Sequence, residues 1–394
     1  MIVCGGNMKA IGMYIFGGSQ TIGHILEGWN VDKILEMTED MKETNSYHFV
    51  KNYPNIPILL PSEWENIELG KYDLLFANPP CSGLSAINRN ASVNNDANKH
   101  IYEVVNMINK IQPKSFLIEN APTLTQLGLP ILKDIAKIIG DKYRLTIIND
   151  LAGNHNVPMH RKRTLIIGWN RNVFKSMPII DDCKSSGFSV RDAFNGLTEN
   201  TPNMELDIHA KNKSLMSFYN LVPTKCSVLI SLANNFESVQ DKLSDSDRDG
   251  ILKFKNRMQS KDSVWDKSAW RLDEDGLAPS MTSLSQYIHP KENRDLYIRE
   301  YARLMGYPDD FIFYQNDCKI STIQCLAQGV PVNFIRYISK QIKDQFINPT
   351  YDDFDCDVIY INQCTAKKKI VRYTLSEFDE CIKIDEKVEK SLWF

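Results

Sequence analysis

Short apolar runs alternate with helical patterns over residues 11–172. The apolar runs have the length and composition expected of strands buried on both faces, and they fall at residues 11–16, 31–37, 74–77, 115–118, 143–148 and 163–169. Between them, apolar side chains recur at helical spacing in residues 100–111 and 130–139. This alternation of strands and helices predicts an α/β fold with a mostly parallel, doubly wound sheet.

The alternation fades after residue 172. Residues 172–272 are polar and irregular in pattern, and they include a basic segment, KFKNRMQSK, at 253–261. Helical spacing returns at 296–305 and 333–346, and two strand-like runs follow at 357–362 and 368–375. We therefore predict a large domain formed by residues 1–173 and 268–346, a smaller irregular domain at 174–267, and a C-terminal appendage at 347–394.

The composition excludes several classes of protein. The 394 residues are 43% hydrophobic and 24% charged, which is ordinary for a globular protein. The net charge of −3 means that any nucleic-acid surface must be a local patch. Nine scattered cysteines without a CxxC pair argue against a disulfide framework and a zinc site, and favour a reducing cytoplasm. No membrane span or secretion signal is visible, so we expect no membrane partner.

One stretch, YDLLFANPPCSGLS, combines a buried strand with candidate chemistry. Pro79 and Pro80 lack the N–H groups that a strand needs, so the strand must end just before Cys81. A lone cysteine is usually a small buried hydrophobe. A cysteine at the carboxyl end of a buried strand, however, lies where open α/β sheets bind their ligands. The Asn-rich segment that follows, residues 89–99, is predicted to be a mobile loop.

Other polar groups also follow predicted strands. The Gly17-Gly18 turn follows the first strand, Glu36 ends the second, and Glu119 ends the strand after Cys81. The carboxyl ends of parallel strands meet along one edge of a sheet, so these groups could share a cleft. A thiol and a carboxyl in one cleft suggest covalent catalysis with acid assistance.

In this order the motifs resemble the DNA (cytosine-5) methyltransferases, which are built on a Rossmann-like S-adenosylmethionine-binding fold. The resemblance runs from about residue 11 to 346. It rests on Phe16-Gly17-Gly18, Glu36, Pro79-Pro80-Cys81-Ser82, Glu119-Asn120, Arg161-Lys162-Arg163, residues 299–308, and Gln328-Gly329-Val330-Pro331. It implies a smaller target-recognition domain at 174–267 and double-stranded DNA as the partner. We also expect a monomer that acts in the cytoplasm of a bacterial or phage-infected cell.

The resemblance implies specific catalytic roles. Cys81 would add to C6 of a flipped-out cytosine, with its pKa lowered by loop N–H groups and nearby cations. Glu119, with its pKa raised by burial, would hydrogen-bond N3, and Arg163 would hold O2. Arg161 would support the loop and a backbone phosphate. Asn120 would order the loop around Pro79 and Pro80 rather than meet the substrate.

The resemblance also implies residues that hold S-adenosylmethionine, with Glu36 on the ribose. They are Phe16, Gly17, Gly18, Glu36, Asn78, Pro79, Gln328 and Val330. The chain departs from the family pattern nearby. Ser19-Gln20-Thr21 replaces a second glycine pair, Ala327-Gln328 replaces Gly-Asn, and Met159-His160 stands where the family has Gln. Residues 56–68 offer no convincing Asp for the adenine amino group, so an altered cofactor preference stays open.

Three other functions remain as alternatives. An RNA cytosine could be the target instead of DNA. Asn78-Pro79-Pro80 also resembles the loop of amino-methyltransferases, although that loop needs an aromatic residue where Cys81 stands and has no use for Glu119 or the arginines. The chain could also be an inactive DNA-binding relative, but a pure binder has no need of a nucleophile.

Overall fold

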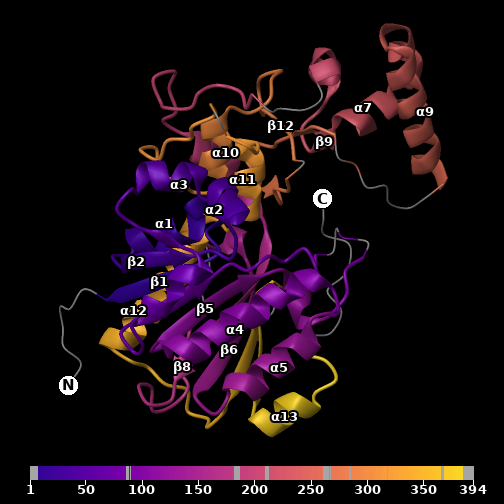
Figure 1. The fold of residues 1–394 in the computed structure, drawn as a ribbon. Helices are drawn as coiled ribbons and strands as arrows, with labels where there is room; N and C mark the ends of the chain where they lie inside the picture. The colour runs from indigo at the N-terminus through magenta and orange to yellow at the C-terminus, as the bar shows by residue number, and fades with distance from the viewer. Residues whose placement is uncertain are drawn as a thin grey trace.

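The computed structural model describes residues 8–85, 88, 90–181, 187–208, 213–260, 266, 268–283, 285–316, 318–364 and 368–384. A large domain is built around one sheet, and a smaller helical domain projects from it (Figure 1). Among the residues in these ranges, no helix is long and apolar enough to cross a membrane. The predictions for Cys4, Cys183, Lys261 and the last ten residues fall outside them.

Nine strands form the central sheet in the order β14-β13-β6-β8-β5-β4-β1-β2-β3. The strands are β1 (Lys9–Met13), β2 (Asn30–Leu35), β3 (Ile58–Leu59), β4 (Leu74–Ala77), β5 (Ser115–Asn120), β6 (Tyr143–Leu151), β8 (Lys162–Asn170), β13 (Val358–Asn362) and β14 (Lys369–Tyr373). β8 and β14 run antiparallel to their neighbours, and the remaining strands share one direction. The predicted mostly parallel sheet is therefore confirmed.

Helices cover both faces of the sheet because its strands are apolar on both sides. α1 (Ser19–Leu26) and α12 (Val332–Ile347) share one hydrophobic cluster with Ala10, Leu74 and Phe76. α4 (Lys99–Ile111) and α5 (Leu129–Ile139) share the other with Ile11, Leu75 and Ala77. Alternate residues of β1 and β4 thus point to opposite layers, as the doubly wound arrangement requires (Figure 1).

The C-terminal appendage is part of the large domain. Both strands predicted in it form, as β13 and β14. β13 pairs in parallel with β6 over five residues, and β14 pairs antiparallel with β13. α13 (Leu375–Glu380) then contacts α5. The appendage, yellow in Figure 1, therefore covers the edge that β6 would otherwise expose.

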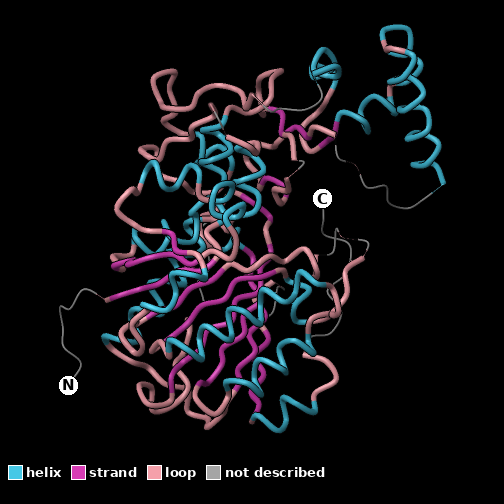
Figure 2. Tube along the Cα trace, viewed as in Figure 1, coloured by secondary structure: helices cyan, strands magenta, loops and turns pink. Residues whose placement is uncertain are grey.

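The smaller domain is more helical than its sequence suggests (Figure 2). Its own core contains buried residues between Phe218 and Ile288, largely from α7 (Val228–Asn234), α8 (Phe236–Val239) and α9 (Asp245–Ser260). The basic segment lies on α9, where Phe254 is buried and Lys253 and Arg257 are exposed. α9 was missed because few apolar positions reveal its period. Phe174, Met177 and Ile180 instead belong to the core of the large domain.

The remaining regular elements connect these parts. They are α2 (Glu39–Asn45), α3 (Tyr47–Asn52), β7 (Met159–His160), α6 (Val190–Phe194), β9 (Cys226–Ser227), β10 (Trp270–Arg271), β11 (Ala278–Pro279), β12 (Tyr287–Ile288), α10 (Ile298–Leu304) and α11 (Thr322–Gln328). β9, β10 and β12 form a small sheet, and β7 pairs with β11.

Candidate active site at the carboxyl edge of the sheet

Cys81 follows β4 at the carboxyl edge of the parallel strands. Asn78 N–H donates a hydrogen bond to the Met13 carbonyl of β1 at 3.2 Å. The two prolines that follow have no N–H group, so the chain leaves the sheet there. Cys81 is half-buried, and its carbonyl accepts from Leu84 N–H at 3.1 Å. A Cβ at Gly83 would lie 2.3 Å from Asn98 Oδ1, so a larger residue here would require the Asn98 side chain to move. The predicted position of the nucleophile is thus occupied by Cys81.

Hydrogen bonds hold the described part of the Asn-rich segment after Cys81. Asn98 Nδ2 donates to the carbonyls of Ser92 and Val93, each at 2.8 Å. Ser92 N–H donates to the Gly83 carbonyl at 2.9 Å, which ties the loop back to the turn beside Cys81. Asparagine side chains readily satisfy backbone groups in irregular segments, and they supply the bonds that a strand or helix would otherwise provide.

Glu119 and Arg163 form an ion pair beside this turn, with 2.6 Å between Oε1 and Nε. β8 runs antiparallel to β5, and Glu119 pairs with Leu165, so the start of β8 lies at the edge where β5 ends. Glu119 is 3% exposed, and burial raises its pKa even though Arg163 and Arg161 oppose the shift. A carboxyl held in this way can share a proton with a ring nitrogen.

The Cys81 thiol is influenced by the same groups. Burial raises its pKa, Arg163 and Arg161 lower it, and Glu119 raises it again. The net direction is upward, so the expected lowering is wrong for the protein without substrate. Desolvation and the neighbouring carboxylate outweigh the two cations because a buried thiolate loses its hydration. Arg163 is nevertheless the largest influence that favours the thiolate.

Arg161 does not occupy the position predicted for it. Its guanidinium donates to the carbonyls of Met281, Ala327 and Gly329, each at 2.7 Å. The side chain is 1% exposed, and burial lowers its pKa to about 9. Contact with a DNA phosphate would require these bonds to break. Arg161 instead fastens the segment that contains Val330 to the start of β8.

Asn120 lies where its predicted role requires. Its Nδ2 donates to the Pro79 carbonyl at 3.3 Å, and its Oδ1 accepts from Ala121 N–H at 2.9 Å. Thr123, three residues after Asn120, donates a hydrogen bond from its hydroxyl to the Leu84 carbonyl. These bonds connect the ends of β4 and β5 on both sides of Cys81. These contacts are the ones that a loop-ordering role for Asn120 requires.

The Gly17-Gly18 turn follows β1 at the same edge. Both residues have positive φ, +71° and +84°, which side chains disfavour. A Cβ on Gly18 would lie 2.3 Å from the Phe49 ring. The turn is held from the far end of the chain, because Tyr307 Oη donates to the Gly17 carbonyl at 3.1 Å. Glycine is therefore required at both positions, because side chains of the protein pack against this buried turn where the resemblance expects a cofactor.

Glu36 is the residue near this turn whose polar atoms best indicate ligand binding. The side chain is fully buried, and Ile15 N–H donates to its Oε1 at 2.7 Å. Its Oε2 is buried without a hydrogen-bond partner in the part of the chain that the structure describes. Burial raises the pKa of Glu36 to about 7. A hydroxyl donor such as a ribose diol would satisfy Oε2, so the residues fit a nucleoside cofactor.

Other predicted cofactor residues lie along the same edge. Phe16 and Val330 are buried, Gln328 ends α11 with an exposed side chain, and Asn78 and Pro79 follow β4. Sequence reasoning missed Ser19 and Tyr307, although both hold the glycine turn. Val330 N–H donates to Ser19 Oγ at 3.1 Å. Ser19 directly follows the glycines, but its partner 311 residues away could not be read from the sequence.

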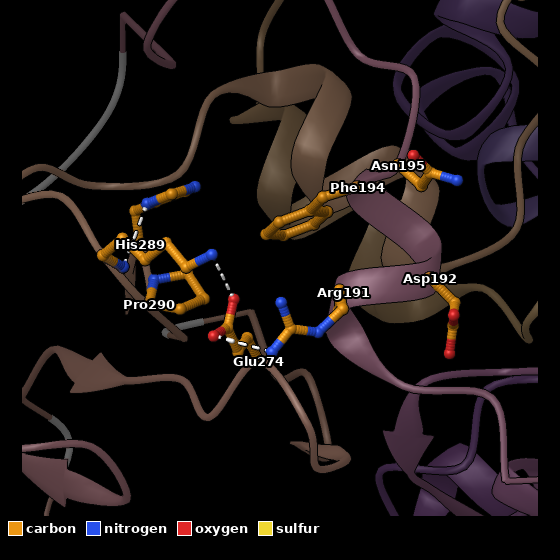
Figure 3. A pocket seen from close by; sticks show the side chains of 8 residues that line it. Arg191, Asp192, Phe194, Asn195, Glu274, His289 and Pro290 are labelled. Atoms are coloured by element: carbon orange, nitrogen blue, oxygen red, sulfur yellow. Dashed lines mark hydrogen bonds and ion pairs between the residues drawn. The ribbon is translucent and has the colours of Figure 1, made fainter.

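A separate cleft of about 350 Å³ lies between α6, the turn at Glu274, and the loop after β12. Figure 3 shows Arg191 reaching Glu274, at 2.8 Å, and Lys291 Nζ lies 2.7 Å from the other oxygen of Glu274. The rings of Phe194 and His289 are nearly parallel, with centroids 6.0 Å apart. The cations of this cleft are neutralised by acids, and none of the predicted site residues lines it.

Known proteins resemble this chain both in sequence and in fold. A family model described as C-5 cytosine-specific DNA methylase matches residues 15–344. The chain is 25% identical over 357 residues to the type II methyltransferase M.MthTI of Methanothermobacter thermautotrophicus, covering 86% of this chain and 97% of that protein. It is 24% identical over 365 residues to M.FnuDI of Fusobacterium nucleatum, covering 86% and 94%.

Two solved structures share the fold. One is a DNA modification methyltransferase encoded within an Escherichia coli prophage, with a TM-score of 0.54, 19% identity and coverage of 86% of this chain and 99% of that one. The other is the Entamoeba histolytica methyltransferase EhMeth, with a TM-score of 0.52, 13% identity and the same coverage. The predicted methyltransferase fold is confirmed. Because the family model spans both halves of the large domain and the region between them, the chain belongs to the C-5 cytosine-specific DNA methylase family.

Proposed function

We propose that this C-5 cytosine-specific DNA methylase uses Cys81, Glu119 and Arg163 to methylate a cytosine that is flipped out of duplex DNA. The observation that carries the proposal is the grouping of these three side chains at the carboxyl edge of the sheet. Glu119 and Arg163 are paired at 2.6 Å, and their charges act on the Cys81 thiol.

The thiol is needed because C5 of an aromatic cytosine is a poor nucleophile. The Cys81 thiolate forms a bond to C6, and the ring electrons move toward N3 and O2. Glu119 gives or shares a proton at N3, and Arg163 holds O2, so neither atom carries the new negative charge alone. C5 is then nucleophilic enough to accept a methyl group. After a base removes the C5 proton, the bond to C6 breaks and Cys81 leaves as thiolate.

The raised pKa of the free thiol fits a site that is completed by its substrate. A buried thiol stays protonated and unreactive while no base is bound. A cytosine that displaces Arg163 from Glu119 would leave Glu119 free to take a proton, which removes its opposing charge from the thiolate. Arg163 then remains as the largest stabilising influence on Cys81.

We propose S-adenosylmethionine as the methyl donor. When bound, it supplies an electrophilic methyl group on a sulfonium. Glu36 would accept hydrogen bonds from the ribose hydroxyls. The turn at Phe16, Gly17 and Gly18 would bring its backbone close to the cofactor. The unpartnered oxygen of Glu36 supports this assignment. Asn78, Pro79, Gln328 and Val330 line the same edge as predicted contacts.

We propose that the smaller domain holds the DNA. Lys253 and Arg257 are one helical turn apart on α9 and both are exposed, as phosphate contacts require. Exchanging both for Gln should lower DNA affinity and reduce the slope of log K against log salt by about 2, because each lost phosphate contact contributes about 0.9. An unchanged salt slope would exclude α9 from the DNA surface.

The cellular setting is also a proposal. The relatives are named type II methyltransferases, which supports a role in a restriction-modification system. Such a role requires access to the cell's own DNA, and we expect a monomer in the cytoplasm.

Bisulfite sequencing of DNA from cells that express the chain tests the function. We expect protected cytosines within one short sequence, and none with Cys81→Ala. Purified Cys81→Ala should still bind S-adenosylmethionine, and the wild type should form a covalent complex with DNA containing 5-fluorocytosine. Full activity of Cys81→Ala would refute the mechanism. Methylation of RNA alone would favour the RNA alternative, and methylated amino groups without a covalent complex would favour the amino-methyltransferase alternative.

A further inference from the structure

Tyr14 follows β1 in a backbone conformation that side chains disfavour. Its φ is +60°, in the left-handed region, and its side chain is 1% exposed. A bulky residue keeps such a conformation only where the surrounding structure requires it, and strain of this kind is concentrated at functional sites. The proposed mechanism gives Tyr14 no task, although the residue lies at the carboxyl edge of the sheet, just before the glycine turn.

A hydrogen bond joins Tyr14 to His100, in the first turn of α4. The Tyr14 hydroxyl lies 3.0 Å from His100 Nδ1, and the two rings meet edge to face with centroids 5.5 Å apart. Burial raises the pKa of Tyr14, and Glu36 raises it further. Burial lowers the pKa of His100, and Lys99 adds to this effect. At neutral pH the phenol is therefore protonated and the imidazole is neutral, so Tyr14 donates and Nδ1 accepts.

The start of α4 is tied to the turn that carries Cys81. The side chain of Asn98, two residues before His100, donates to the Ser92 carbonyl at 2.8 Å. Ser92 N–H in turn donates to the Gly83 carbonyl at 2.9 Å. Hydrogen bonds therefore lead from the segment around His100 back to the turn that holds the proposed nucleophile.

The backbone bonds between β1 and β4 do not extend to this turn. Asn78 N–H donates to the Met13 carbonyl, and the next two residues are prolines, which have no N–H group to donate. Tyr14 N–H is used on the other side, by the Leu35 carbonyl at the end of β2. Beyond the end of β4, the side-chain bond from Tyr14 to His100 thus connects the segment after β1 with the segment after β4.

We propose that Tyr14 is a positioning residue, which through His100 sets the placement of the Cys81 turn relative to the glycine turn after β1. This inference rests on the proposed function. The two turns would act on neighbouring atoms of one cytosine ring, Cys81 at C6 and the methyl donor at C5. A misplacement of about 1 Å can slow a reaction by about 10²-fold even when both reactants still bind. Loss of the hydroxyl should therefore slow methyl transfer and leave each half of the site working.

Tyr14→Phe removes only the hydroxyl and tests this role in the full-length protein. Three quantities are measured: the single-turnover rate of methyl transfer to DNA, the affinity for S-adenosylhomocysteine, and the exchange of the cytosine C5 hydrogen with water when no methyl donor is present. Exchange reports on Cys81 without the donor, because the thiolate adds to C6, C5 takes up a solvent proton and loses its own, and the thiolate leaves. We expect transfer to slow by about tenfold or more, with affinity and exchange unchanged.

Tyr143→Phe is the matched control. Tyr143 is buried at the start of β6, at the opposite edge of the sheet, where its hydroxyl donates to the Pro113 carbonyl at 2.8 Å. Both variants lose one hydrogen bond of a buried tyrosine, so their melting temperatures should fall by similar amounts. Only Tyr14→Phe should slow methyl transfer. An equally slow Tyr143→Phe would assign the effect to lost stability and overturn the inference.

Variants of His100 give an independent check. Asparagine places an acceptor oxygen close to the position of Nδ1, whereas leucine offers no acceptor. His100→Leu should be as slow as Tyr14→Phe, the double variant no slower than either, and His100→Asn close to the wild type. A slow His100→Asn, or a double variant in which the two losses multiply, would overturn the inference, because the hydroxyl and the ring would then act separately.

The separate measurements distinguish this inference from the proposed function. Slower exchange in Tyr14→Phe would mean that the hydroxyl acts on Cys81 alone, and weaker S-adenosylhomocysteine binding would mean that it belongs to the methyl-donor site. Unchanged methyl transfer would mean that it has no part in the reaction. Each of these results overturns the inference while the proposed function stands. A wild-type protein that shows neither exchange nor methyl transfer would refute the proposed function, and the inference with it.

Discussion

Arg161 and Arg163 stand two residues apart, yet the structure predicts different consequences for their loss. Arg161 donates to the carbonyls of Met281, Ala327 and Gly329, whereas Arg163 pairs with Glu119. Methionine has a similar length but no donors. Arg161→Met should therefore destabilise the fold, and Arg163→Met should chiefly abolish methyl transfer.

The size of the effect follows from the lost bonds. Three buried carbonyls would lose their donor, and each unsatisfied acceptor costs at least about 1 kcal/mol, or ~3 kcal/mol in total. For a protein of this length the unfolding entropy converts ~3 kcal/mol into a melting temperature lower by ~4 °C. Without its bond to Arg161, the segment at Gly329 should become more mobile. This should weaken the neighbouring hydrogen bond from Val330 N–H to Ser19 Oγ. The affinity for S-adenosylmethionine should fall as well.

Differential scanning fluorimetry and calorimetric cofactor titration measure both effects, with Arg163→Met as the matched control. We expect the control to bind the cofactor normally and to lack activity. Its melting temperature should also fall, because Glu119 is left buried without its cation. The reasoning would be refuted if Arg161→Met kept its melting temperature and lost only DNA affinity, because that pattern belongs to a phosphate contact.

Three further predictions concern pH, the thiol and the appendage. The pKa of Glu36 is about 7 in the folded protein and 4.5 in the unfolded chain, so stability falls as the pH rises from 4.5 through 7. Urea unfolding at pH 8 should therefore show Glu36→Gln to be more stable than the unliganded wild type by up to about 3 kcal/mol, and at pH 4 it should show no gain. Because burial raises the pKa of Cys81, mass spectrometry should find slow alkylation at pH 7 without DNA, and slower still in Arg163→Met, since Arg163 lowers this pKa; fast alkylation at pH 7 would contradict the raised pKa. A chain that ends at Asn348 should aggregate on size-exclusion chromatography, because it exposes the β6 edge that β13 covers; a monodisperse product would contradict this role for the appendage.

Apolar patterning was sufficient for most of the sheet. Strands buried on both faces stand out as continuous apolar runs, and both strands of the appendage were found in this way. The direction of β8 could not be predicted, since an apolar run does not show whether a strand lies parallel or antiparallel to its neighbours. α2 and α9 were missed because short or solvent-facing helices have few buried residues; α9 buries only Ile251 and Phe254 among its described side chains.

The site was predictable in its local groups but not in its long-range bonds. Cys81, Glu119 and Arg163 lie where the motifs place them, at ends or starts of strands. The role of Arg161 depends on carbonyls more than 100 residues away, as its bond to Met281, 120 residues later, shows. The pKa of Cys81 depends on how far burial outweighs two cations, which only the packed structure decides.

The connection between Ser19 and Val330 has a consequence for biosynthesis. The bond joins residues 311 positions apart, and a second bond, from His24 Nδ1 to Ser339 Oγ at 2.8 Å, spans 315 positions. A ribosome must therefore release most of the chain before the glycine turn can be fixed. A nascent chain that stops before residue 330 would carry Cys81 but not the bond that holds the glycine turn. If this turn holds the methyl donor as proposed, methyl transfer to DNA could not begin until residue 330 has been synthesised.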